Sequence, residues 1–434
     1  MPSIQSLVDG LSAVGPEARL DSLRALMGKI ESGEIAKPRT GDDVNNHIHT
    51  TFSFSPYSPS KALYLAYASG LGTAGIVDHD TISGAGEFIE AGRIIGMATT
   101  IGIECRVDMS LTPLKGRRIN NTDQNSIAYI VLHGVPHTMI DSVTSFFKPY
   151  IEARNVRNRK MTEKINILFS SFGIELDFDR DVVSLSEYTN GGSITERHIS
   201  LALSRKMIGR FGRGRALVTF LKEGLQLRLD EKSEKLLCDG ESPYYEYDLL
   251  GFIKSEFIAS FYIDAALECP PVRDVLALSQ RIGSVSAYAY LGDVSDSVTG
   301  DKRAQKFEDD YIEELFEVIS ALGFNAVTYM PSRNTAVQLS RVRGLCERFG
   351  LFQISGVDIN SPRQSFVCAE MQAPEFENLK ESTWALIGHE IEATGNIQHG
   401  MFSGQTVHAY PDLNERIALF REIGKRRIKG ETRI

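Results

Sequence analysis

Short apolar runs alternate with helix-forming segments from residue 44 to residue 104, and this alternation restricts the fold more than any other feature of the sequence. Periodicity and flanking turn residues predict strands at 44–49, 73–77 and 99–103 and helices at 59–69 and 88–95. Ser58 supplies a side-chain cap, and Pro59 a first residue, for the first of these helices. Strand–helix–strand units place consecutive strands parallel in one sheet. The sequence therefore predicts an α/β protein.

Side chains that bind metal ions stand where these strands end. His47 and His49 close the first strand, His79 follows the second, and Glu104 follows the third. A lone His-x-His pair on a strand would point its two rings to opposite faces and would indicate no site. The carboxyl ends of parallel strands open onto one face, however, so we expect the four side chains to converge. Imidazole and carboxylate groups are good ligands for zinc, manganese or iron.

Four motifs occur in order along the chain: His47-Ile48-His49, Val77-Asp78-His79-Asp80-Thr81, Gly102-Ile103-Glu104 and Gly356-Val357-Asp358-Ile359-Asn360. This order resembles that of the polymerase and histidinol phosphatase (PHP) family of metal-dependent phosphoesterases. Residues 194–200 are similar to a segment of its bacterial nucleotide-phosphatase subgroup. The resemblance covers approximately residues 42–135 and 275–365.

The resemblance implies a distorted (β/α)7-type barrel with an inserted, mainly helical subdomain. We expect residues 1–40 to form an N-terminal helical extension, residues 41–140 and 276–434 the PHP-like metal-binding barrel, and residues 141–275 the insertion. An insertion on the ligand face of such a barrel would act as a lid that sets substrate choice. Its basic residues would meet an anionic substrate or, alternatively, form a solvated helix face.

The resemblance also implies a metal site. His47, His49, Glu104 and Asp358 would hold one ion. His79 would act in catalysis as a general acid, contact the substrate, or bind a second ion. The cofactor would be one or two divalent ions per chain, either zinc, manganese or iron.

Further residues receive candidate roles. Arg197 and His198 resemble a substrate-binding position of the family, where a guanidinium group suits phosphate, or alternatively form an exposed pair at the start of a helix. His133 follows an apolar run and is an additional ligand candidate. Asp78 and Asp80 flank His79, and each would hold a ring N–H or cap the next helix.

Some usual ligand positions of the family are substituted here. Phe54 and Ser55 occupy the positions seven and eight residues after the first histidine, where the family places aspartate or histidine. Tyr290 stands where a histidine is expected, and so does Asn360, which remains a ligand candidate through its amide oxygen. Amide and phenol groups bind these metals less well than imidazole, so the resemblance implies a reduced cluster.

The two ends of the chain carry no predicted site residue. Residues 3–11 and 16–30 have helical periodicity. Residues 366–434 predict one or two strands followed by a helix at 413–425.

Composition excludes some classes of protein. A formal net charge of −9 argues against a nucleic-acid polymer as partner. No apolar run approaches the roughly 20 residues that span a bilayer, and residues 1–5 lack a secretory signal. We therefore expect a cytoplasmic protein without membrane contact. The five cysteines are scattered, which predicts reduced thiols.

These features together predict a metal-dependent phosphoesterase that hydrolyses a small anionic phosphate ester, such as a nucleotide or sugar phosphate, by metal-activated water. Two alternatives stay open. One is a degenerate, non-catalytic PHP-like ligand-binding protein, and the other is a metal-dependent hydrolase of a non-phosphate substrate. The sequence sets neither the individual substrate nor the oligomeric state.

Overall fold

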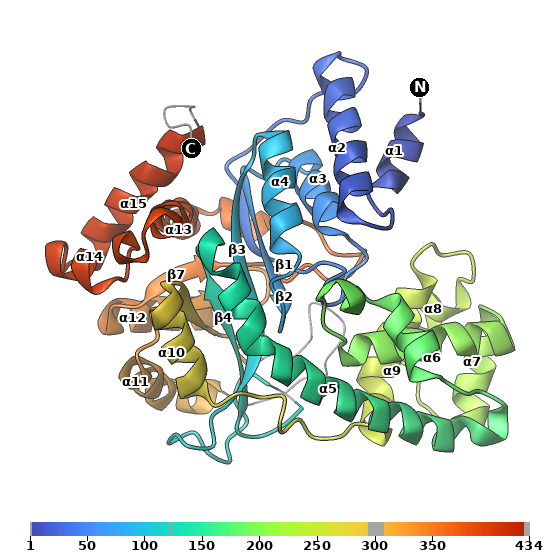
Figure 1. Ribbon diagram of the computed structural model, residues 1–434. Helices are drawn as coiled ribbons and strands as arrows, with labels where there is room; N and C mark the ends of the chain where they lie inside the picture. Colours follow the sequence, from blue (N-terminus) through green and yellow to red (C-terminus); the bar gives the residue numbers. More distant parts are fainter. Residues whose placement is uncertain (1, 122, 294–307, 429–434) are drawn as a thin grey trace.

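A seven-stranded sheet with its strands in chain order forms the centre of the protein (Figure 1). The structure, a computed structural model, describes residues 2–121, 123–293 and 308–428. The strands are β1 (Val44–Ile48), β2 (Thr73–His79), β3 (Ala98–Asp108), β4 (Ile127–His133), β5 (Val285–Ala289), β6 (Ala326–Tyr329) and β7 (Phe352–Ser355). Strand β4 is antiparallel to both neighbours, and the other neighbouring pairs are parallel. The three strands predicted at 44–49, 73–77 and 99–103 correspond to β1, β2 and β3, and they are parallel as predicted.

The sheet curves until its two edges almost meet. Beyond β7 the chain returns beside β1 and forms one parallel bridge, between Ile48 and Ile359. The backbone N–H of His49 donates to the carbonyl of Ile359 at 3.0 Å, and the N–H of Ile359 donates to the carbonyl of His47 at 3.1 Å. The protein is therefore an α/β barrel that is nearly closed and distorted by the reversed strand β4, which confirms the predicted fold class.

Helices cover the outside of this barrel (Figure 1). They are α3 (Pro59–Ala68), α4 (Ala85–Ile95), α10 (Val272–Ile282), α11 (Ile312–Leu322) and α12 (Ala336–Phe349), with α1 (Ile4–Gly10) and α2 (Pro16–Glu31) at the N-terminus. The hydroxyl of Ser58 accepts a hydrogen bond from the N–H of Lys61 and so caps α3 as predicted. Helix α2 packs against α3 and α4, and the helices predicted for residues 3–11 and 16–30 are confirmed.

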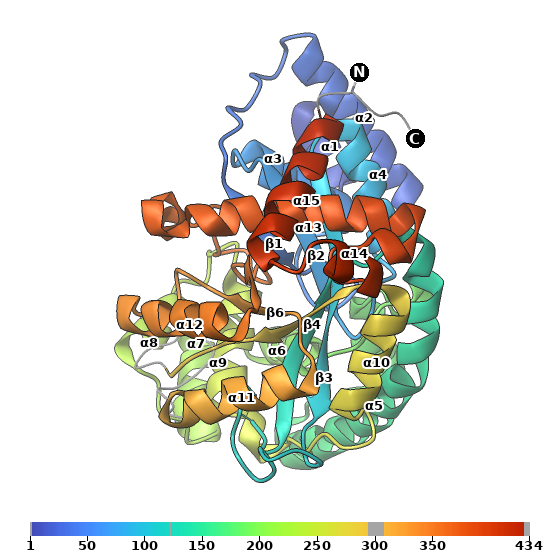
Figure 2. The same cartoon turned by 90° about the vertical axis from the view of Figure 1, so that its left-hand side faces the viewer.

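The C-terminal part differs from the prediction. Instead of one or two strands, residues 366–412 contain α13 (Glu377–Gly395), α14 (Gly404–Ala409) and short 3-10 turns, and α15 (Leu413–Ile428) follows. Figure 2 shows α13 and α15 side by side across the barrel. Helix α13 is buried between the sheet and α15, with Leu386 packed near Phe352 and Phe420. Because apolar residues surround α13 on several sides, its sequence lacks the one-sided periodicity of a surface helix.

The insertion is a group of helices with its own hydrophobic cluster, which includes Met161, Leu203 and Phe261. Its helices are α5 (Ile140–Phe169), α6 (Glu196–Phe211), α7 (Arg215–Thr219), α8 (Glu231–Cys238) and α9 (Tyr245–Glu256). Helix α5 has 30 residues and runs from the barrel to the far side of this group (Figure 1). Helix α5 follows β4 in the chain and therefore connects the barrel to the insertion.

Two further expectations concern the whole chain. All five cysteines are free thiols. None of the helices in the described ranges is both long enough and apolar enough to cross a membrane.

Candidate metal centre

Three ligand-type side chains meet at the carboxyl ends of β1 and β3. Nε2 of His47 lies 3.6 Å, and Nε2 of His49 lies 3.7 Å, from Oε2 of Glu104. All three residues are buried, and one ligand atom from each lies within 4.8 Å of the other two. Among the described residues, no other group of three or more such side chains comes this close together. The sequence placed these three at this end of the barrel, and the structure brings them together.

The irregular shape of β1 explains how two alternate residues face one point. In a regular strand the rings of His47 and His49 would point to opposite faces. The pairing of β1 with β2 shifts register between Asn45 and Ile48, as at a β-bulge. Gly356 adds a second requirement, because a Cβ atom built on it would lie 2.5 Å from Cβ of His47. The turn after β7 can therefore pass this close to His47 only with glycine.

Asp358 adds a second carboxylate at the edge of this group. Its Oδ1 atom lies 3.4 Å from Nε2 of His49. The side-chain amide of Asn360 donates from Nδ2 to the same oxygen at 2.6 Å. Oδ1 of Asn360 is buried and has no hydrogen-bond partner in the described structure. Asn360 thus holds Asp358 in place, and its role as a ligand stays a prediction.

Burial and neighbouring charges set the ionisation of the group. Burial lowers the pKa of His49 well below its ordinary value, and the rings of His79 and His47 lower it further. Burial alone would also lower the pKa of His47, but the carboxylate of Glu104 outweighs it and the pKa is raised. Burial would raise the pKa of Glu104, yet His79 and His47 hold it well below its ordinary value. The result is an ionised carboxylate among imidazoles.

Nε2 of His49 shows whether a metal ion fits here. This atom is buried and has no hydrogen-bond partner within the described chain, although oxygens of Glu104 and Asp358 lie 3.7 and 3.4 Å away. A buried nitrogen without a partner is unfavourable. A divalent ion would satisfy it, and imidazole nitrogens with carboxylate oxygens are a donor set that zinc, manganese and iron accept. The residues present therefore fit a divalent metal ion.

His79, at the end of β2, adjoins the group. Its Nδ1 atom lies 2.9 Å from Oε2 of Glu104. Its ring stacks on that of His49 with 4.4 Å between the ring centroids. Because one ring nitrogen of His79 already contacts Glu104, Nε2 is the nitrogen that is left for a substrate or a second ion.

The aspartates on either side of His79 have other partners than predicted. Asp78 accepts hydrogen bonds from the N–H and hydroxyl of Thr50 and from the hydroxyl of Ser53, each at 2.6 Å. It therefore fixes the turn that follows β1. Asp80 forms an ion pair with Arg154 of the insertion. The prediction that these carboxylates hold the ring of His79 or cap the next helix is wrong for both.

A cavity of about 130 Å³ opens beside the ligand group. Its lining includes His47, His79, Glu104 and Asp358, and also three cations, Arg197, Lys254 and Arg333. A smaller neighbouring cavity of about 40 Å³ shares His79, Arg197 and Lys254 with the first. Four of the predicted metal ligands and the predicted substrate residue Arg197 therefore face one space, whereas His49 is fully buried behind it and does not line the cavity.

His198 does not reach this space. Its Nδ1 atom accepts a hydrogen bond from the N–H of Thr195 at 3.0 Å, within the cap of α6. Its ring packs edge-on against Phe54 at 4.9 Å between centroids. Burial lowers its pKa to about 3. In this structure His198 supports α6, whereas its neighbour Arg197 lines the cavity.

His133 lies in the barrel interior near the ligand group. It is buried at the end of β4, and its Nε2 atom has no hydrogen-bond partner in the ranges described. Burial lowers the pKa of His133 to about 3, and the next influences on it are His47 and Glu104. It is close to the three ligands but is not one of the group that they form.

The substituted ligand positions are packed in other ways. Phe54 is buried beside His198. Tyr290 lines the cavity, and its hydroxyl donates to Asp309 at 2.6 Å. Phe54 is thus part of the packing against α6, and the hydroxyl of Tyr290 is engaged with Asp309.

Other residues of the site were not predicted. Lys254 and Arg333 line the cavity, but no local sequence pattern distinguishes them from surface cations. Arg154 lies in the basic stretch of 141–170, which allowed either a substrate contact or a solvated face. It is in fact 3% exposed and contacts Asp80.

Comparisons with known proteins are limited. No family model matches the chain. A 5'-3' exoribonuclease of Haemophilus influenzae is 36% identical over 58 residues, which are 13% of this chain and only 21% of that enzyme. Among solved structures, a protein from Bifidobacterium adolescentis assigned as a metal-dependent phosphoesterase shares 21% identity, with a TM-score of 0.49 over 76% of this chain and 91% of that one. An amidohydrolase from Chromobacterium violaceum shares 16% identity, with a TM-score of 0.49 over 78% and 96%.

Proposed function

We propose that this protein is a PHP-like metal-dependent phosphoesterase that hydrolyses a small phosphate ester, such as a nucleotide or a sugar phosphate. The observation that carries the proposal is the buried group of His47, His49 and Glu104, which opens onto a cavity also lined by cations. Carboxylates and imidazoles suit a metal ion, and guanidinium and ammonium groups suit phosphate oxygens. The 58-residue match to an exoribonuclease, an enzyme that cleaves phosphodiesters, is in line with a phosphoryl substrate.

Each group has a distinct part in this proposal. His47, His49, Glu104 and Asp358 would hold the ion. A bound divalent ion lowers the pKa of a water molecule, screens the charge of the phosphate and orients the attack.

The remaining residues bind the phosphate group and move a proton. Arg197, Lys254 and Arg333, which line the same cavity, would contact the phosphate oxygens. His79 would exchange a proton with the ester oxygen through Nε2, because its Nδ1 atom contacts Glu104.

Metal content and phosphate release test the proposal together. The full chain, purified without chelator, is analysed for metals and assayed with nucleotides, sugar phosphates and amides, with zinc, manganese or iron added. We expect the wild-type chain to release phosphate. His49→Ala and Glu104→Gln should each lower the rate of release by at least about 100-fold and should lose the metal. His408→Ala, which changes an exposed histidine of α14, is the matched control and should retain both. Metal-dependent cleavage of amides alone would refute the phosphoesterase proposal.

A non-catalytic binding protein is the second candidate, because Phe54 and Tyr290 fill positions at which the family places ligands. This candidate predicts that the wild-type chain binds a phosphate ester without turning it over. Calorimetric titration with the same esters, in the presence of metal, distinguishes the two. Binding without phosphate release would favour the second candidate.

A further inference from the structure

The insertion contacts three consecutive residues beside the candidate metal centre. The hydroxyl of Ser193 donates to the carbonyl of His79 at 2.6 Å. Arg154 of α5 forms an ion pair with the carboxylate of Asp80. The hydroxyl of Thr81 donates to the carbonyl of Gly191 at 2.7 Å. The turn that follows β2 is therefore held from the side of the insertion at every residue from 79 to 81.

This turn has a backbone conformation that needs support. Asp80 has a φ of 58°, in the left-handed region that, apart from glycine, mainly asparagine and aspartate adopt. Its N–H donates to the carbonyl of Glu104 at 2.8 Å. The same turn thus connects the end of β2, which carries His79, to the end of β3, which carries Glu104. A change in the turn would alter the 2.9 Å contact between His79 and Glu104.

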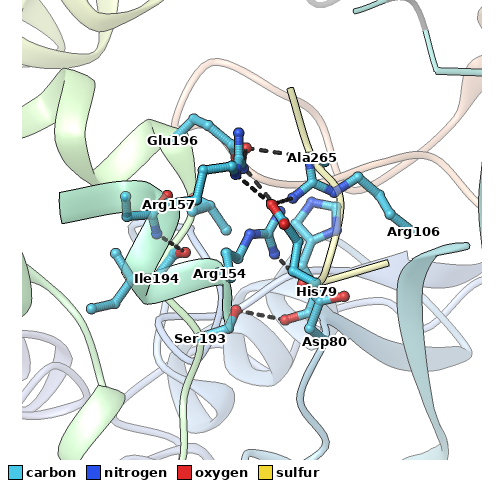
Figure 3. A network of polar contacts seen from close by, with 12 residues as sticks. His79, Asp80, Arg106, Arg154, Arg157, Ser193, Ile194, Glu196 and Ala265 are labelled. Atoms are coloured by element: carbon cyan, nitrogen blue, oxygen red, sulfur yellow. Dashed lines mark hydrogen bonds and ion pairs between the residues drawn. The ribbon is translucent and has the colours of Figure 1, made fainter. Parts of the chain in front are cut away.

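Arg154 is itself fixed by a network of buried charges (Figure 3). Its Nη2 atom lies 3.5 Å from Glu196 of α6. Glu196 also pairs with Arg157 of α5 and with Arg106 of β3, and the distance to Arg106 is 3.3 Å. Glu268 pairs with Arg106 and Arg157 as well. The network therefore joins the insertion to the strand that carries Glu104.

Because the charges of this network are buried, the network holds the insertion in one position on the barrel. The side chains of Arg154, Arg157 and Arg106 are at most 5% exposed. Moving the insertion away would separate Arg154 from Asp80, and Arg106 from both Glu196 and Glu268. Buried charges would lose their partners, which is strongly unfavourable. A lid that opens by swinging away from the barrel would have to break several such pairs at once. The part of the insertion around Arg154 is thus a fixed wall of the site.

We propose that Arg154 is a positioning residue that, through Asp80, fixes the turn after β2 and thereby sets the place of His79 against Glu104. This inference rests on the proposed function for its catalytic consequence. The structural part, the dependence of His79 on Arg154, concerns the metal-free chain as well. The structural and the catalytic consequence can therefore be measured independently.

The first readout is the ring of His79 in the metal-free, full-length protein. Long-range ¹H–¹⁵N spectra of histidine-labelled protein report the tautomer and hydrogen bonding of each ring, and His79→Gln assigns the signal. We expect Arg154→Met and Asp80→Asn each to shift the His79 signal. Asparagine tolerates the left-handed region, so Asp80→Asn removes the charge and keeps the turn residue. Arg159→Met is the matched control, because Arg159 lies on the same helix and pairs with Asp179 at the surface.

The second readout is turnover of the metal-loaded protein. We expect Arg154→Met and Asp80→Asn each to lower kcat by about 10- to 100-fold with little change in KM, as for other residues that orient a catalytic group. Arg154→Lys keeps the charge but loses the planar fork, so it should restore part of the activity. The two substitutions combined should cost no more than Arg154→Met alone, because Arg154→Met already removes the contact with Asp80.

The outcomes separate the inference from the proposed function. An unchanged His79 signal in both Arg154→Met and Asp80→Asn overturns the inference, whatever the activity. Should Arg154→Met fail to fold, Asp80→Asn and Arg154→Lys decide the question. A wild-type chain that releases no phosphate refutes the proposed function, whereas a shifted His79 signal in the variants would still support the inference.

Discussion

His47 and His49 are two residues apart, and their pKa values are shifted in opposite directions. The pKa of His49 is lowered, first by burial and then by the neighbouring rings, so this ring is neutral and available to a metal ion at neutral pH. The pKa of His47 is raised despite its burial, because Glu104 stabilises the protonated ring. Below the raised pKa of His47 a metal ion must therefore displace a proton from this ring, whereas His49 is already deprotonated at neutral pH.

This difference predicts how metal binding depends on pH. A protonated imidazole has no lone pair for a metal, so affinity should rise with pH until His47 is deprotonated, above its ordinary pKa of about 6.5. Below that point affinity should fall about tenfold per pH unit, with one proton released per ion. Isothermal titration in two buffers of different ionisation enthalpy measures both quantities. An affinity that is constant from pH 6 to pH 8 would contradict the expected proton competition at His47.

A substitution at Gly356 tests whether the position of His47 matters for metal binding. In Gly356→Ala the new Cβ atom would lie 2.5 Å from Cβ of His47, so the turn or the ring must move. We expect metal affinity to fall by about tenfold or more. The matched control is Gly344→Ala in α12, where no atom lies within 4 Å of the added Cβ. Equal metal affinity in the two variants, measured by titration, would show that the turn can shift without moving His47.

Helix α2 is joined to α4 by a buried ion pair. Arg19 of α2 donates to Glu87 of α4 from Nε at 3.0 Å and from Nη2 at 2.6 Å, and both side chains are at most 3% exposed. Glu87 also accepts from the N–H and hydroxyl of Ser60 at the start of α3. The N-terminal helices are therefore attached to the barrel by a pair of charges as well as by apolar contacts.

Removing the cation of this pair should destabilise the protein strongly. In Arg19→Met the carboxylate of Glu87 would stay buried without its partner, which costs about 3–5 kcal/mol. Arg24→Met on the same helix removes the ion pairs with Asp21 and Glu90, in which Arg24 is 46% exposed, and should change stability by less than about 1 kcal/mol. Urea unfolding followed by circular dichroism compares the two variants. A similar midpoint for both would mean that the buried pair contributes no more than the exposed one.

The proposed ligands include residues from the first and the last strand of the barrel, which are far apart in the sequence. His47 and His49 belong to its first strand, whereas Asp358 follows its last strand. An ion held by all of them would bind the folded barrel and not the unfolded chain. Metal binding should therefore stabilise the fold as a unit, by about 2.7 kcal/mol at a free metal concentration of 100 times Kd.

Thermal unfolding measures this stabilisation. The Tm should rise with added zinc, manganese or iron and return to its starting value with a chelator. The same metals should leave the Tm of His49→Ala unchanged. A metal-induced rise of equal size in His49→Ala would place the ion elsewhere in the protein.

Local sequence patterns carried the prediction of the first half of the barrel. Caps such as Ser58, glycine stops and apolar periodicity act over a few residues, so β1 to β3 and α3 could be located before their partners were known. The positions of His47, His49 and Glu104 at the ends of predicted parallel strands placed them at one end of the barrel. The C-terminal strands predicted from residues 366–412 were wrong, because packing on several sides removed the periodicity of α13.

The pairing of distant residues is decided only when the chain is folded. Arg154 and Asp80 are 74 residues apart, and the short-range pattern of 141–170 fits a solvated face as well as a buried one. The same holds for His198, which matches a substrate position in sequence but caps α6 in the structure. Residue types and their order therefore determined the barrel and its ligand-type side chains. Burial and charge pairing between elements far apart in the chain decided which of the other polar residues reach the cavity, because these energies depend on neighbours that short-range sequence does not specify.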